Sequence, residues 1–284
     1  MKILLTGKAG QVGRELQNGL SLLGELLAFD RSELDISDAD QVSDCIRRIR
    51  PDIIVNAAAY TNVEAAESDK AIAFAVNAKA PGVLAEAGKA AGALVVHYST
   101  DYVFDGLKAT PYSEGDATAP LNAYGDSKRA GEQAILSSGC RHLILRVGWV
   151  YAAEGKNFLT TIVRRAGEGA PLRVVDDQYG TPTPAAWIAV ATSALLANGR
   201  VLEGPGLYHL SPSGSTSWCG FAREIVNRSG LRCPVHGISS LEYPARAIRP
   251  RNSLLNSCRL RSDFGIGLPD WREGLNLVNA NVSA

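Results

Sequence analysis

The sequence predicts an α/β fold: a doubly wound, Rossmann-like parallel sheet with a smaller C-terminal domain of mixed structure. Two observations in the first half of the chain support this prediction. Short, continuous apolar runs alternate with longer segments of helical periodicity, and a glycine-rich turn joins the first apolar run to the first helical segment. A third observation separates the second half: after Gly204 the chain becomes richer in Gly, Pro, Ser and Arg, and its predicted elements become shorter.

The elements of the first half follow one another in a regular order. The predicted strands are the continuous apolar runs, at residues 2–6, 26–29, 52–55, 93–96 (continuing to 100) and 142–146. The predicted helices lie between them, at residues 11–23, 37–50, 71–91 and 123–137. Ser37 is the expected N-cap of the second helix, Pro51 stops that helix, and Gly92 ends the third. Strands buried on both faces give such apolar runs, so the helices between them imply a parallel sheet.

The second half predicts fewer regular elements. Helices are expected at residues 157–168 and 183–196, and residues 172–175 are a candidate sixth strand. We therefore assign residues 1–150 to the first domain, which a segment at roughly 171–200 completes. Residues 151–170 and 201–284 form the second domain, which we expect to pack over the carboxyl ends of the strands.

Composition and charge argue against several classes of protein. Lys and Arg number 29 and Asp and Glu number 29, a formal net charge of +0, so we expect no binding of nucleic acid through bulk charge. The longest nearly apolar run, residues 185–197, is too short to cross a bilayer, and the N-terminal apolar run ends at Leu5, too soon for a secretory signal. Five dispersed cysteines without a C-x-x-C spacing and four scattered histidines predict reduced thiols, a cytoplasmic protein and no metal site.

A cofactor site is predicted where the first strand ends. Gly7, Gly10 and Gly13 allow a tight turn and a close backbone approach, and the helix that follows presents free N–H groups to a pyrophosphate. Asp30, at the end of the second strand, is placed to bind the adenosine ribose hydroxyls, whereas its neighbour Arg31 could instead meet a 2′-phosphate. The expected cofactor is therefore NADH or NADPH.

Two further stretches are candidates for contact with the same cofactor. Asp35 and Ile36 follow the second strand and are expected to flank the adenine. Residues 56–61 end the third strand, and their small side chains would let a cofactor lie across the strand ends.

The candidate catalytic residues are a phenol, an ammonium and a hydroxyl. Tyr124 and Lys128 are four residues apart in a predicted helix, so they share one face. A phenol with a pKa of about 10 transfers protons poorly at neutral pH, and a nearby positive charge would lower that pKa. Ser99 and Thr100 end the fourth strand, where open α/β sheets place their chemistry, and one of these hydroxyls can bind a substrate oxygen beside the tyrosine.

Together these features resemble the extended short-chain dehydrogenase/reductase superfamily and, within it, the dTDP-4-dehydrorhamnose reductase family. The strings that carry the closer resemblance lie in the same order over nearly the whole chain, at residues 97–106, 177–183, 206–210, 249–253 and 268–271. The resemblance implies reduction of dTDP-4-dehydro-β-L-rhamnose to dTDP-β-L-rhamnose with NADH or NADPH, the last step in the synthesis of that nucleotide sugar. It also implies that the first domain binds the dinucleotide and the second the nucleotide sugar.

The resemblance assigns roles to individual residues. Tyr124 would be the proton donor, Lys128 its pKa partner and a ribose ligand, and Thr100 the hydroxyl that tunes the tyrosine and touches the sugar. The cofactor stretches of the family match Gly10, Gln11 and Val12, Asp30, and Ala59, Tyr60 and Thr61. The substrate contacts match Thr100, Asp101 and Trp149, and Arg249 and Asn252 could face the nucleotide diphosphate.

This sequence differs from some family members at the residues of a metal site. Those members bind Mg²⁺ at a dimer interface through three glutamates. Glu15 fits the first position here, but the second falls near Ala186 and the third near Arg272, with Glu273 displaced by one residue. Because one carboxylate does not supply the oxygens that this cation needs, Mg²⁺ is doubtful, and we expect a monomer or a homodimer that does not depend on it.

Two alternative functions remain open at this stage. A reductase of a related dTDP-4-keto-6-deoxy sugar would carry the same motifs, because few side chains set the sugar pocket. A non-catalytic NAD(P)-binding regulatory subunit, such as the β subunit of methionine adenosyltransferase, shares the fold. Intact Tyr124, Lys128 and Thr100 favour an enzyme.

Overall fold

The central element is a six-stranded sheet in the order β10-β5-β4-β3-β1-β2, in which every neighbouring pair is parallel. It is seen in a computed structural model that describes residues 1–199 and 206–282. The strands of this sheet are β1 (Lys2–Thr6), β2 (Glu25–Phe29), β3 (Ile53–Asn56), β4 (Leu94–Thr100), β5 (His142–Val147) and β10 (Gly206–His209). The chain passes from β1 to β2 on one side and then to β3 on the other, so the strand order reverses between β1 and β3.

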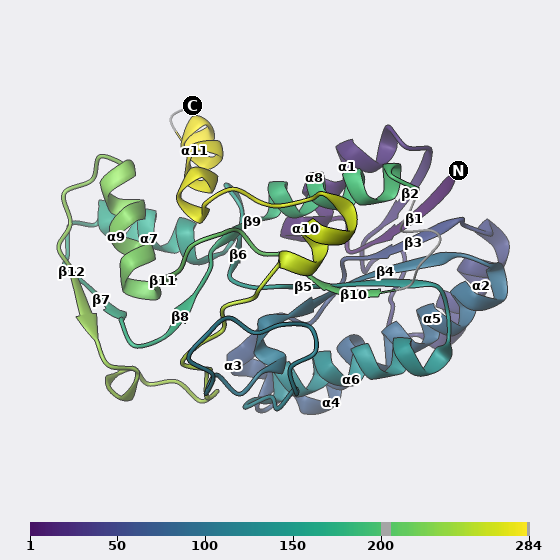
Figure 1. Cartoon of the computed structure of the whole chain (residues 1–284), viewed down its shortest axis with the longest axis horizontal. Helices are drawn as coiled ribbons and strands as arrows, with labels where there is room; N and C mark the ends of the chain where they lie inside the picture. The colour runs from purple at the N-terminus through teal and green to yellow at the C-terminus, as the bar shows by residue number, and fades with distance from the viewer. Residues whose placement is uncertain (200–205, 283–284) are drawn as a thin grey trace.

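Helices cover both faces of this sheet (Figure 1). Helices α1 (Gln11–Ser21) and α8 (Ala185–Ala197) pack on one face, and α2 (Ala39–Ile49), α5 (Ala80–Ala91) and α6 (Ala123–Ser138) pack on the other. The strand residues alternate between the two hydrophobic clusters: Ile3 and Leu5 join α1 and α8, whereas Leu4 joins α2 and α5. Both faces are therefore buried, which explains the continuous apolar runs, and the predicted doubly wound sheet is confirmed.

The prediction that residues 172–175 add the sixth strand of the sheet is wrong. Strand β7 (Leu172–Val175) pairs in parallel with β12 (Val235–Ile238), and the sixth strand is β10, beside β5. A short apolar run does not reveal its partner, and the exposed Arg173 within this run fits a two-stranded ribbon with one solvated face. Strand β10 was not predicted because its four residues begin with Gly206 and end with His209, so they do not form a continuous apolar run.

A second hydrophobic core lies at the other end of the molecule (Figure 1). It is built from α7 (Phe158–Gly167), α9 (Trp218–Arg228) and α11 (Trp271–Val282), together with β7. Aromatic side chains dominate it, and the indoles of Trp149 and Trp218 stack with ring centroids 3.5 Å apart. The remaining elements are α3 (Val63–Ala66), α4 (Lys70–Phe74), α10 (Cys258–Phe264), β6 (Val150–Tyr151), β8 (Tyr179–Gly180), β9 (Thr183–Pro184) and β11 (Thr216–Ser217). The predicted change of domain between residues 200 and 201, and the change of composition at Gly204, lie outside the described residues.

Two helices differ in detail from the sequence prediction. The N-cap of α2 is Asp38 and not Ser37, because the Asp38 carboxylate accepts from the N–H groups of Asp40 and Gln41. The predicted helix at residues 71–91 is α4, a π-helical turn at Ala75–Lys79, and α5 in direct succession. A π-helical turn inside a helix frequently accompanies a functional site.

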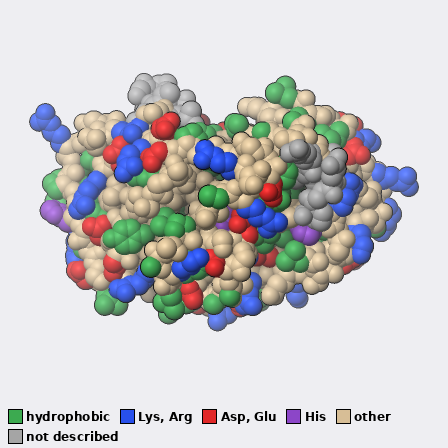
Figure 2. Space-filling view, in the orientation of Figure 1, with side chains coloured by type: hydrophobic (Ala, Val, Ile, Leu, Met, Phe, Trp, Pro, Cys, Tyr) green, Lys and Arg blue, Asp and Glu red, His purple; other side chains and the backbone are tan. Residues whose placement is uncertain are grey.

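The surface carries both signs of charge. Lys and Arg side chains are interspersed with Asp and Glu on the face shown in Figure 2, as the formal net charge of +0 leads one to expect. All five cysteines are free thiols. Within residues 1–199 and 206–282, none of the helices is both long and apolar enough to cross a membrane.

Candidate active site

The glycine loop lies at the point where the strand order reverses. Gly7 has φ +75°, and a Cβ on Gly7 would come within 2.6 Å of the Ala58 nitrogen after β3. A Cβ on Gly13 would run into the carbonyl oxygen of Gly7, so only glycine lets helix α1 begin this close to β1. Gly10 precedes α1 in an extended conformation and has no side chain that could cap the helix. The first N–H groups of α1 therefore face the crevice where doubly wound sheets bind dinucleotide phosphates.

The neighbouring Gln11 gives a further sign that this loop fits a ligand. Its Oε1 atom is buried and has no hydrogen-bond partner in the described part of the chain. A buried acceptor without a partner costs free energy unless a donor reaches it. A hydroxyl group of a bound dinucleotide would supply that donor.

The end of β2 holds a carboxylate with cations close to it. The Asp30 carboxylate accepts from the N–H and hydroxyl of Ser32, at 2.9 and 2.6 Å, and these hydrogen bonds hold its pKa below the ordinary value. Lys8, within the glycine loop, places its Nζ 4.0 Å from Asp30 and 2.6 Å from Glu33. The Arg31 side chain is exposed. Two cationic side chains, Lys8 and Arg31, therefore lie near Asp30, and the sequence analysis identified only Arg31.

The other two predicted cofactor stretches differ in their surroundings. Asp35 accepts from the N–H and hydroxyl of Ser37, whereas Ile36 is buried in the hydrophobic cluster between the sheet and α2. Tyr60, in the stretch from Ala59 to Thr61, is held by Asn77 of the π-helical turn: the Asn77 amide accepts from the Tyr60 N–H at 2.8 Å and donates to its carbonyl at 2.9 Å. The same amide donates to the Ser127 hydroxyl on α6 at 3.0 Å, so Asn77 joins this stretch to the catalytic helix.

The structure brings Thr100 and Tyr124 together. Tyr124 lies in the first turn of α6, which Asn122 caps by accepting from the Gly125 N–H at 2.8 Å. Burial raises the pKa of Tyr124 to about 12, and the hydrogen bond with the Thr100 hydroxyl opposes that rise. Thr100 in turn donates to the Asp101 carboxylate at 3.0 Å. The two hydroxyls thus form one polar group at the carboxyl edge of the sheet.

Lys128 has partners that the sequence did not indicate. It is 2% exposed, and its Nζ donates to the Tyr98 carbonyl at 2.5 Å and lies 3.2 Å from Nε2 of His97. Burial lowers the pKa of Lys128 to about 8, and Glu132, one turn further along α6, opposes that effect. Burial is the largest influence on the pKa of Tyr124, ahead of the Thr100 hydrogen bond and the charge of Asp101.

Asp101 and Trp149 lie on the side of Thr100 toward the second core. Asp101 is 2% exposed, burial raises its pKa to about 6, and its Oδ2 has no hydrogen-bond partner among the residues described. Trp149 has φ +48°, an uncommon backbone conformation for such a residue, and its indole N–H donates to the Ser253 hydroxyl at 3.2 Å. Ser253 also hydrogen-bonds Asp101, so these side chains form a connected wall beside Thr100.

The two predicted diphosphate contacts are engaged in different ways. Nη2 of Arg249 pairs with Glu64 of α3 at 2.8 Å, while its buried Nε has no partner within the described ranges. Asn252 donates to the carbonyl oxygens of Lys108 and Thr110, at 2.6 and 3.1 Å. Asn252 therefore fastens the 105–110 loop, and it also lines a cavity of about 460 Å³.

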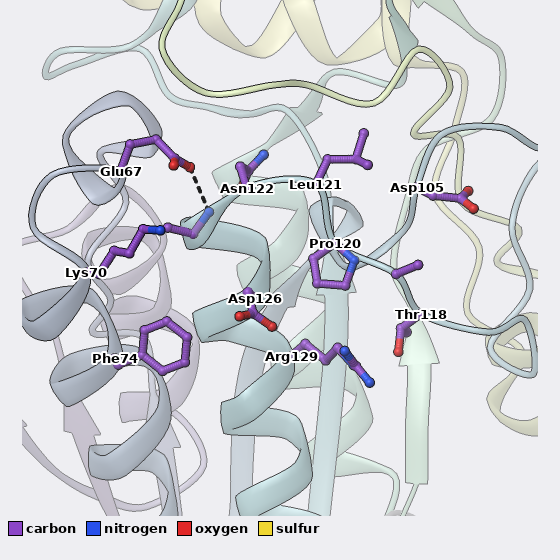
Figure 3. Close-up of a pocket in the computed structure, with 12 residues that line it drawn as sticks. Glu67, Lys70, Phe74, Asp105, Thr118, Pro120, Leu121, Asn122, Asp126 and Arg129 are labelled. Carbon is purple, nitrogen blue, oxygen red and sulfur yellow. Dashed lines mark hydrogen bonds between the residues drawn. The ribbon is translucent and has the colours of Figure 1, made fainter.

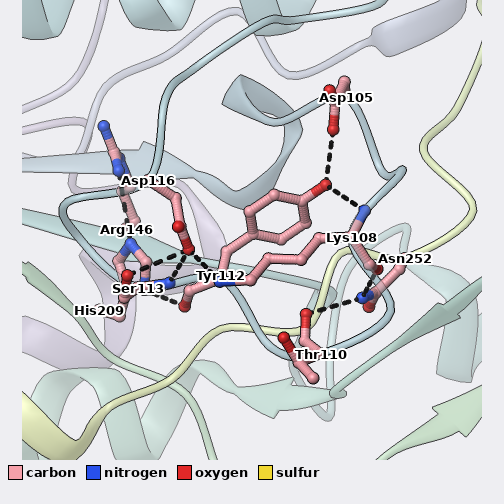
Figure 4. A network of polar contacts seen from close by, with 9 residues as sticks. All are labelled: Asp105, Lys108, Thr110, Tyr112, Ser113, Asp116, Arg146, His209 and Asn252. Atoms are coloured by element: carbon pink, nitrogen blue, oxygen red, sulfur yellow. Dashed lines mark hydrogen bonds and ion pairs between the residues drawn. The ribbon is translucent and has the colours of Figure 1, made fainter.

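That loop is held by a larger polar network (Figure 4). The Tyr112 hydroxyl donates to Asp105 at 2.6 Å, and the Lys108 ammonium pairs with Asp116 at 2.5 Å. Below them, His209 of β10 bonds the Tyr112 carbonyl at 3.1 Å. The 460 Å³ cavity adjoins this network, and Lys108, Tyr179 and Arg251 line it together with Asn252.

A second cavity, of about 580 Å³, lies beside the beginning of α6 (Figure 3). Asp126 and Arg129 of α6 line it together with Lys70 and Phe74 of α4. Asp126 is two residues from Tyr124, so the helix places it on nearly the opposite side. Neither Tyr124 nor Lys128 lines this cavity, which is therefore separate from the candidate catalytic group.

Sequence reasoning gave no supporting role to three buried polar residues near the candidate catalytic group. Asn56 ends β3, His97 lies within β4, and Asn77 lies in the π-helical turn; each is 1% exposed. For Asn56 and His97 the sequence did contain an indication, since a polar side chain inside a strand buried on both faces requires a hydrogen-bond partner. The sequence did not show which partner each of them meets.

Among enzymes with a doubly wound sheet, a tyrosine followed four residues later by a lysine, beside a hydroxyl at the end of the fourth strand, is typical of short-chain dehydrogenases/reductases. This chain has that fold and that arrangement. Comparison with known proteins narrows the class further. The family model described as RmlD substrate binding domain matches residues 1–283, and the chain belongs to the dTDP-4-dehydrorhamnose reductase family.

Individual relatives cover nearly the whole chain. A dTDP-4-dehydrorhamnose reductase of Burkholderia thailandensis is 46% identical over 98% of this chain and 97% of its own. The crystal structure of a dTDP-4-dehydrorhamnose reductase from Bacillus anthracis in complex with NADP is 36% identical, covers 98% of both chains and superposes with a TM-score of 0.93. One from Clostridium acetobutylicum is 33% identical, covers 100% of both chains and gives a TM-score of 0.95.

The metal prediction can be compared with the side chains. In the part of the chain that the structure describes, no three or more His, Cys, Asp and Glu side chains group together so that they could hold a metal ion.

Proposed function

We propose that this protein reduces dTDP-4-dehydro-β-L-rhamnose to dTDP-β-L-rhamnose with NADPH or NADH. The observation that carries the proposal is the group of half-buried Tyr124 with buried Thr100 and Lys128, at the same carboxyl edge of the sheet as the glycine loop. The relatives named above support the choice of substrate, because they are named dTDP-4-dehydrorhamnose reductases and match this chain over nearly their whole length.

The cofactor site in this proposal follows the crevice between β1 and β3. The residues assigned to it are Gly7, Gly10, Gln11, Val12, Gly13, Asp30, Arg31, Asp35, Ile36, Ala59, Tyr60, Thr61, Tyr124 and Lys128. The N–H groups at the start of α1 would hold the pyrophosphate, and Asp30 or its neighbouring cations would meet the adenosine ribose. Since Ile36 is buried, we assign its contact to the backbone rather than to the side chain. When bound, the reduced nicotinamide supplies a hydride.

The proton in the reaction comes from Tyr124. Hydride addition to C4 of the keto sugar forms a C–H bond, and the carbonyl π electrons move to oxygen as an alkoxide. Tyr124 donates its hydroxyl proton to that oxygen, and the Thr100 hydroxyl, which donates to Asp101 in the structure, would turn its proton to the developing charge. A pKa of about 12 keeps the phenol protonated at neutral pH, which is the form that a reduction needs.

The remaining assigned residues orient the nucleotide sugar. Asp101 and Trp149 would contact the sugar beside Thr100, and Arg249 would turn its unpartnered Nε toward the diphosphate. Asn252 would act at the rim, where the 460 Å³ cavity with Tyr179, Lys108 and Arg251 is wide enough for part of a nucleotide.

The proposal includes the organisation of the molecule. Residues 1–150, completed by roughly 171–200, would bind the dinucleotide, and residues 151–170 and 201–284 the nucleotide sugar. The enzyme would act in the cytoplasm as a monomer or homodimer, without nucleic acid, membrane or Mg²⁺. The balanced charge and the dispersed, odd set of cysteines in the sequence support this setting.

The decisive experiment is a turnover assay over a panel of dTDP-4-keto sugars, each with NADPH and with NADH. We expect oxidation of the dinucleotide with dTDP-4-dehydrorhamnose and formation of dTDP-rhamnose, identified by mass and by NMR at C4. Faster turnover of another keto sugar would reassign the substrate. Tight dinucleotide binding without turnover of any sugar would instead favour a regulatory subunit.

A further inference from the structure

The carboxylate of Glu33, in the turn after β2, lies against the cation of the glycine loop. The Lys8 ammonium donates to Oε1 of Glu33 at 2.8 Å and lies 2.6 Å from Oε2. Oε2 also accepts from the Asp30 N–H at 2.9 Å. Glu33 therefore joins the glycine loop to the end of β2, the two stretches between which the adenosine ribose is proposed to bind.

Backbone hydrogen bonds hold both partners of this ion pair in place. The Lys8 N–H donates to the Phe29 carbonyl at 3.1 Å, and the Glu33 N–H donates to the Asp30 carbonyl at 3.2 Å. Exposed ion pairs are ordinarily weak because two long side chains must be held in one geometry. Here the backbone holds the loop beside the turn, and the Lys8 and Glu33 side chains are only 27% and 45% exposed. The hydrogen bond from Lys8 is the main reason that the pKa of Glu33 lies below its ordinary value, so this carboxylate is charged at neutral pH.

The second cation near Asp30 also lies against a carboxylate. Nε of Arg31 is 3.4 Å from Oδ2 of Asp35. The charged side chains around the end of β2 are thus two cations and three carboxylates, with a formal charge of −1: Lys8 and Arg31 against Asp30, Glu33 and Asp35. A phosphate monoester would add about −1.5 to −2 to a group that is already negative.

The Asp30 carboxylate suits a hydroxyl better than a phosphate. Its Oδ1 accepts from the N–H and hydroxyl of Ser32, whereas Oδ2 lies 4.0 Å from the Lys8 Nζ and accepts no hydrogen bond from the described part of the chain. A ribose 2′-hydroxyl can donate to Oδ2, as doubly wound sheets commonly arrange it. A 2′-phosphate dianion has no proton to donate and would repel this oxygen.

We propose that Glu33 is a specificity-determining residue for the dinucleotide: it neutralises the Lys8 ammonium, so this cation does not compensate the charge of a 2′-phosphate, and the protein binds NADH more tightly than NADPH. This inference rests on the proposed function, which leaves both dinucleotides open. Asp30 supplies the acceptor for the 2′-hydroxyl, and Glu33 removes the positive charge that a 2′-phosphate needs.

The test is a titration of the full chain with NADH and with NADPH, without sugar, followed by the fluorescence of the reduced nicotinamide. We expect the wild type to bind NADH at least about fivefold more tightly than NADPH. In Glu33→Gln the amide oxygen still accepts from the Asp30 N–H, but the negative charge is lost. The dissociation constant for NADPH should therefore fall about fivefold, while that for NADH should change less than about twofold.

Two further variants show whether the effect belongs to this pair. Lys8→Met added to Glu33→Gln removes the cation that the first change released, so NADPH binding should return close to the wild-type value. Glu25→Gln is the matched control: it removes the same charge from an exposed residue at the other end of β2, about 17 Å along the strand from Asp30. The ratio of the two dissociation constants should not change in this control.

Several results would overturn the inference. They are a wild type that binds NADPH at least as tightly as NADH, a Glu33→Gln variant that gains equally for both dinucleotides or for neither, and a double variant that keeps the gain. Binding of neither dinucleotide to the wild type would refute the proposed cofactor site as well. The titration does not use the sugar, so the reductase activity is decided separately in the turnover assay.

Discussion

Asp101 is a buried carboxyl group with few partners for its charge. Thr100 donates to Oδ1 of this carboxyl group, while Oδ2 has no partner among the described residues. Burial therefore raises its pKa from the ordinary 3.8 to about 6. In a candidate active site, a carboxyl group whose charged form is disfavoured by burial indicates a role in binding rather than in stability.

This shift predicts how stability depends on pH. Between about pH 4 and 6 the folded protein binds a proton at Asp101 that the unfolded chain has lost, so stability falls as the pH rises through this window. Above pH 6 the loss is complete, at about 3 kcal/mol. Asp101→Asn should therefore raise the melting temperature at pH 7.5 and lose that advantage near pH 4. An equal difference at both pH values, measured by calorimetry, would contradict the assignment.

Tyr124→Phe removes the proposed proton donor and keeps the ring. We expect kcat to fall by about 10²- to 10⁴-fold, because general acid catalysis is lost, while the dissociation constant for NADPH changes little. Steady-state turnover and fluorescence titration measure the two quantities. Tyr208→Phe is the control, since its hydroxyl bonds Asp263 of α10, away from Thr100. Retention of most of the turnover in Tyr124→Phe would remove this residue from the mechanism.

At the residue scale, local spacing shows up in a sequence and long-range partners do not. Tyr124 and Lys128 are neighbours on one helix face, so four residues of sequence predict them as a pair. Asn56 and His97 belong to different strands and meet only because β3 and β4 pair in register. Nothing near Lys128 in the sequence indicates that its amine turns to β4 instead of to Tyr124.

Helix α2 illustrates the same limit at the scale of an element. Ser37 was the expected N-cap, although its neighbour Asp38 is an equally good N-cap residue. The structure uses Asp38 as the cap, while the Ser37 hydroxyl donates to Asp35 at 2.7 Å. The existence of the helix was predictable, whereas its first residue depends on the turn that leads into it.

The two residues can be separated by mutation. Asp38→Ala should lower the free energy of unfolding by about 1 kcal/mol, because two backbone N–H groups of α2 lose their acceptor. Ser37→Ala is matched in size and should cost clearly less. Urea midpoints of both variants measure the difference. A larger loss in Ser37→Ala would show that the helix is capped as the sequence suggested.

The buried strands of the large sheet were the most predictable elements, because burial on both faces leaves a continuous apolar run. Strand β7 has a similar run but a different partner, β12, which lies about sixty residues away in the sequence and exposes His236 and Gly237. The π-helical turn at Ala75–Lys79 left no mark in the helical pattern. Its role became visible only through the contacts of Asn77 with Tyr60 and Ser127.

At the scale of the whole molecule, one buried ion pair fastens the catalytic helix to the sheet. Arg146 of β5 and Glu132 of α6 make two hydrogen bonds, and both side chains are 4% exposed. Nη1 of Arg146 also lies 3.4 Å from Nε2 of His209, and Nδ1 of His209 hydrogen-bonds the Tyr112 carbonyl (Figure 4). Tyr112 and Asn252 in turn hold the 105–110 loop. The guanidinium of Arg146 therefore links helix α6, strand β5 and, through His209, the segment at Tyr112.

Glu132→Gln should destabilise the fold by about 3–5 kcal/mol, because it leaves the Arg146 charge buried without a counter-charge. Replacing both residues with Met should cost much less than the single change. Glu168→Gln, which breaks an exposed pair with Arg164, is the surface control and should cost at most about 1 kcal/mol. Urea unfolding compares the three. Equal losses in the buried and the exposed variants would refute this view of the pair.

The stacked indoles of Trp149 and Trp218 have an optical consequence. Their planes are inclined by only 3°, and one ring follows β5 whereas the other opens α9. Two chromophores this close share their excitation, so their circular dichroism in the ultraviolet carries a coupled band that neither ring gives alone. That band is an intrinsic, dye-free gauge of whether the segment that follows β5 stays packed against α9.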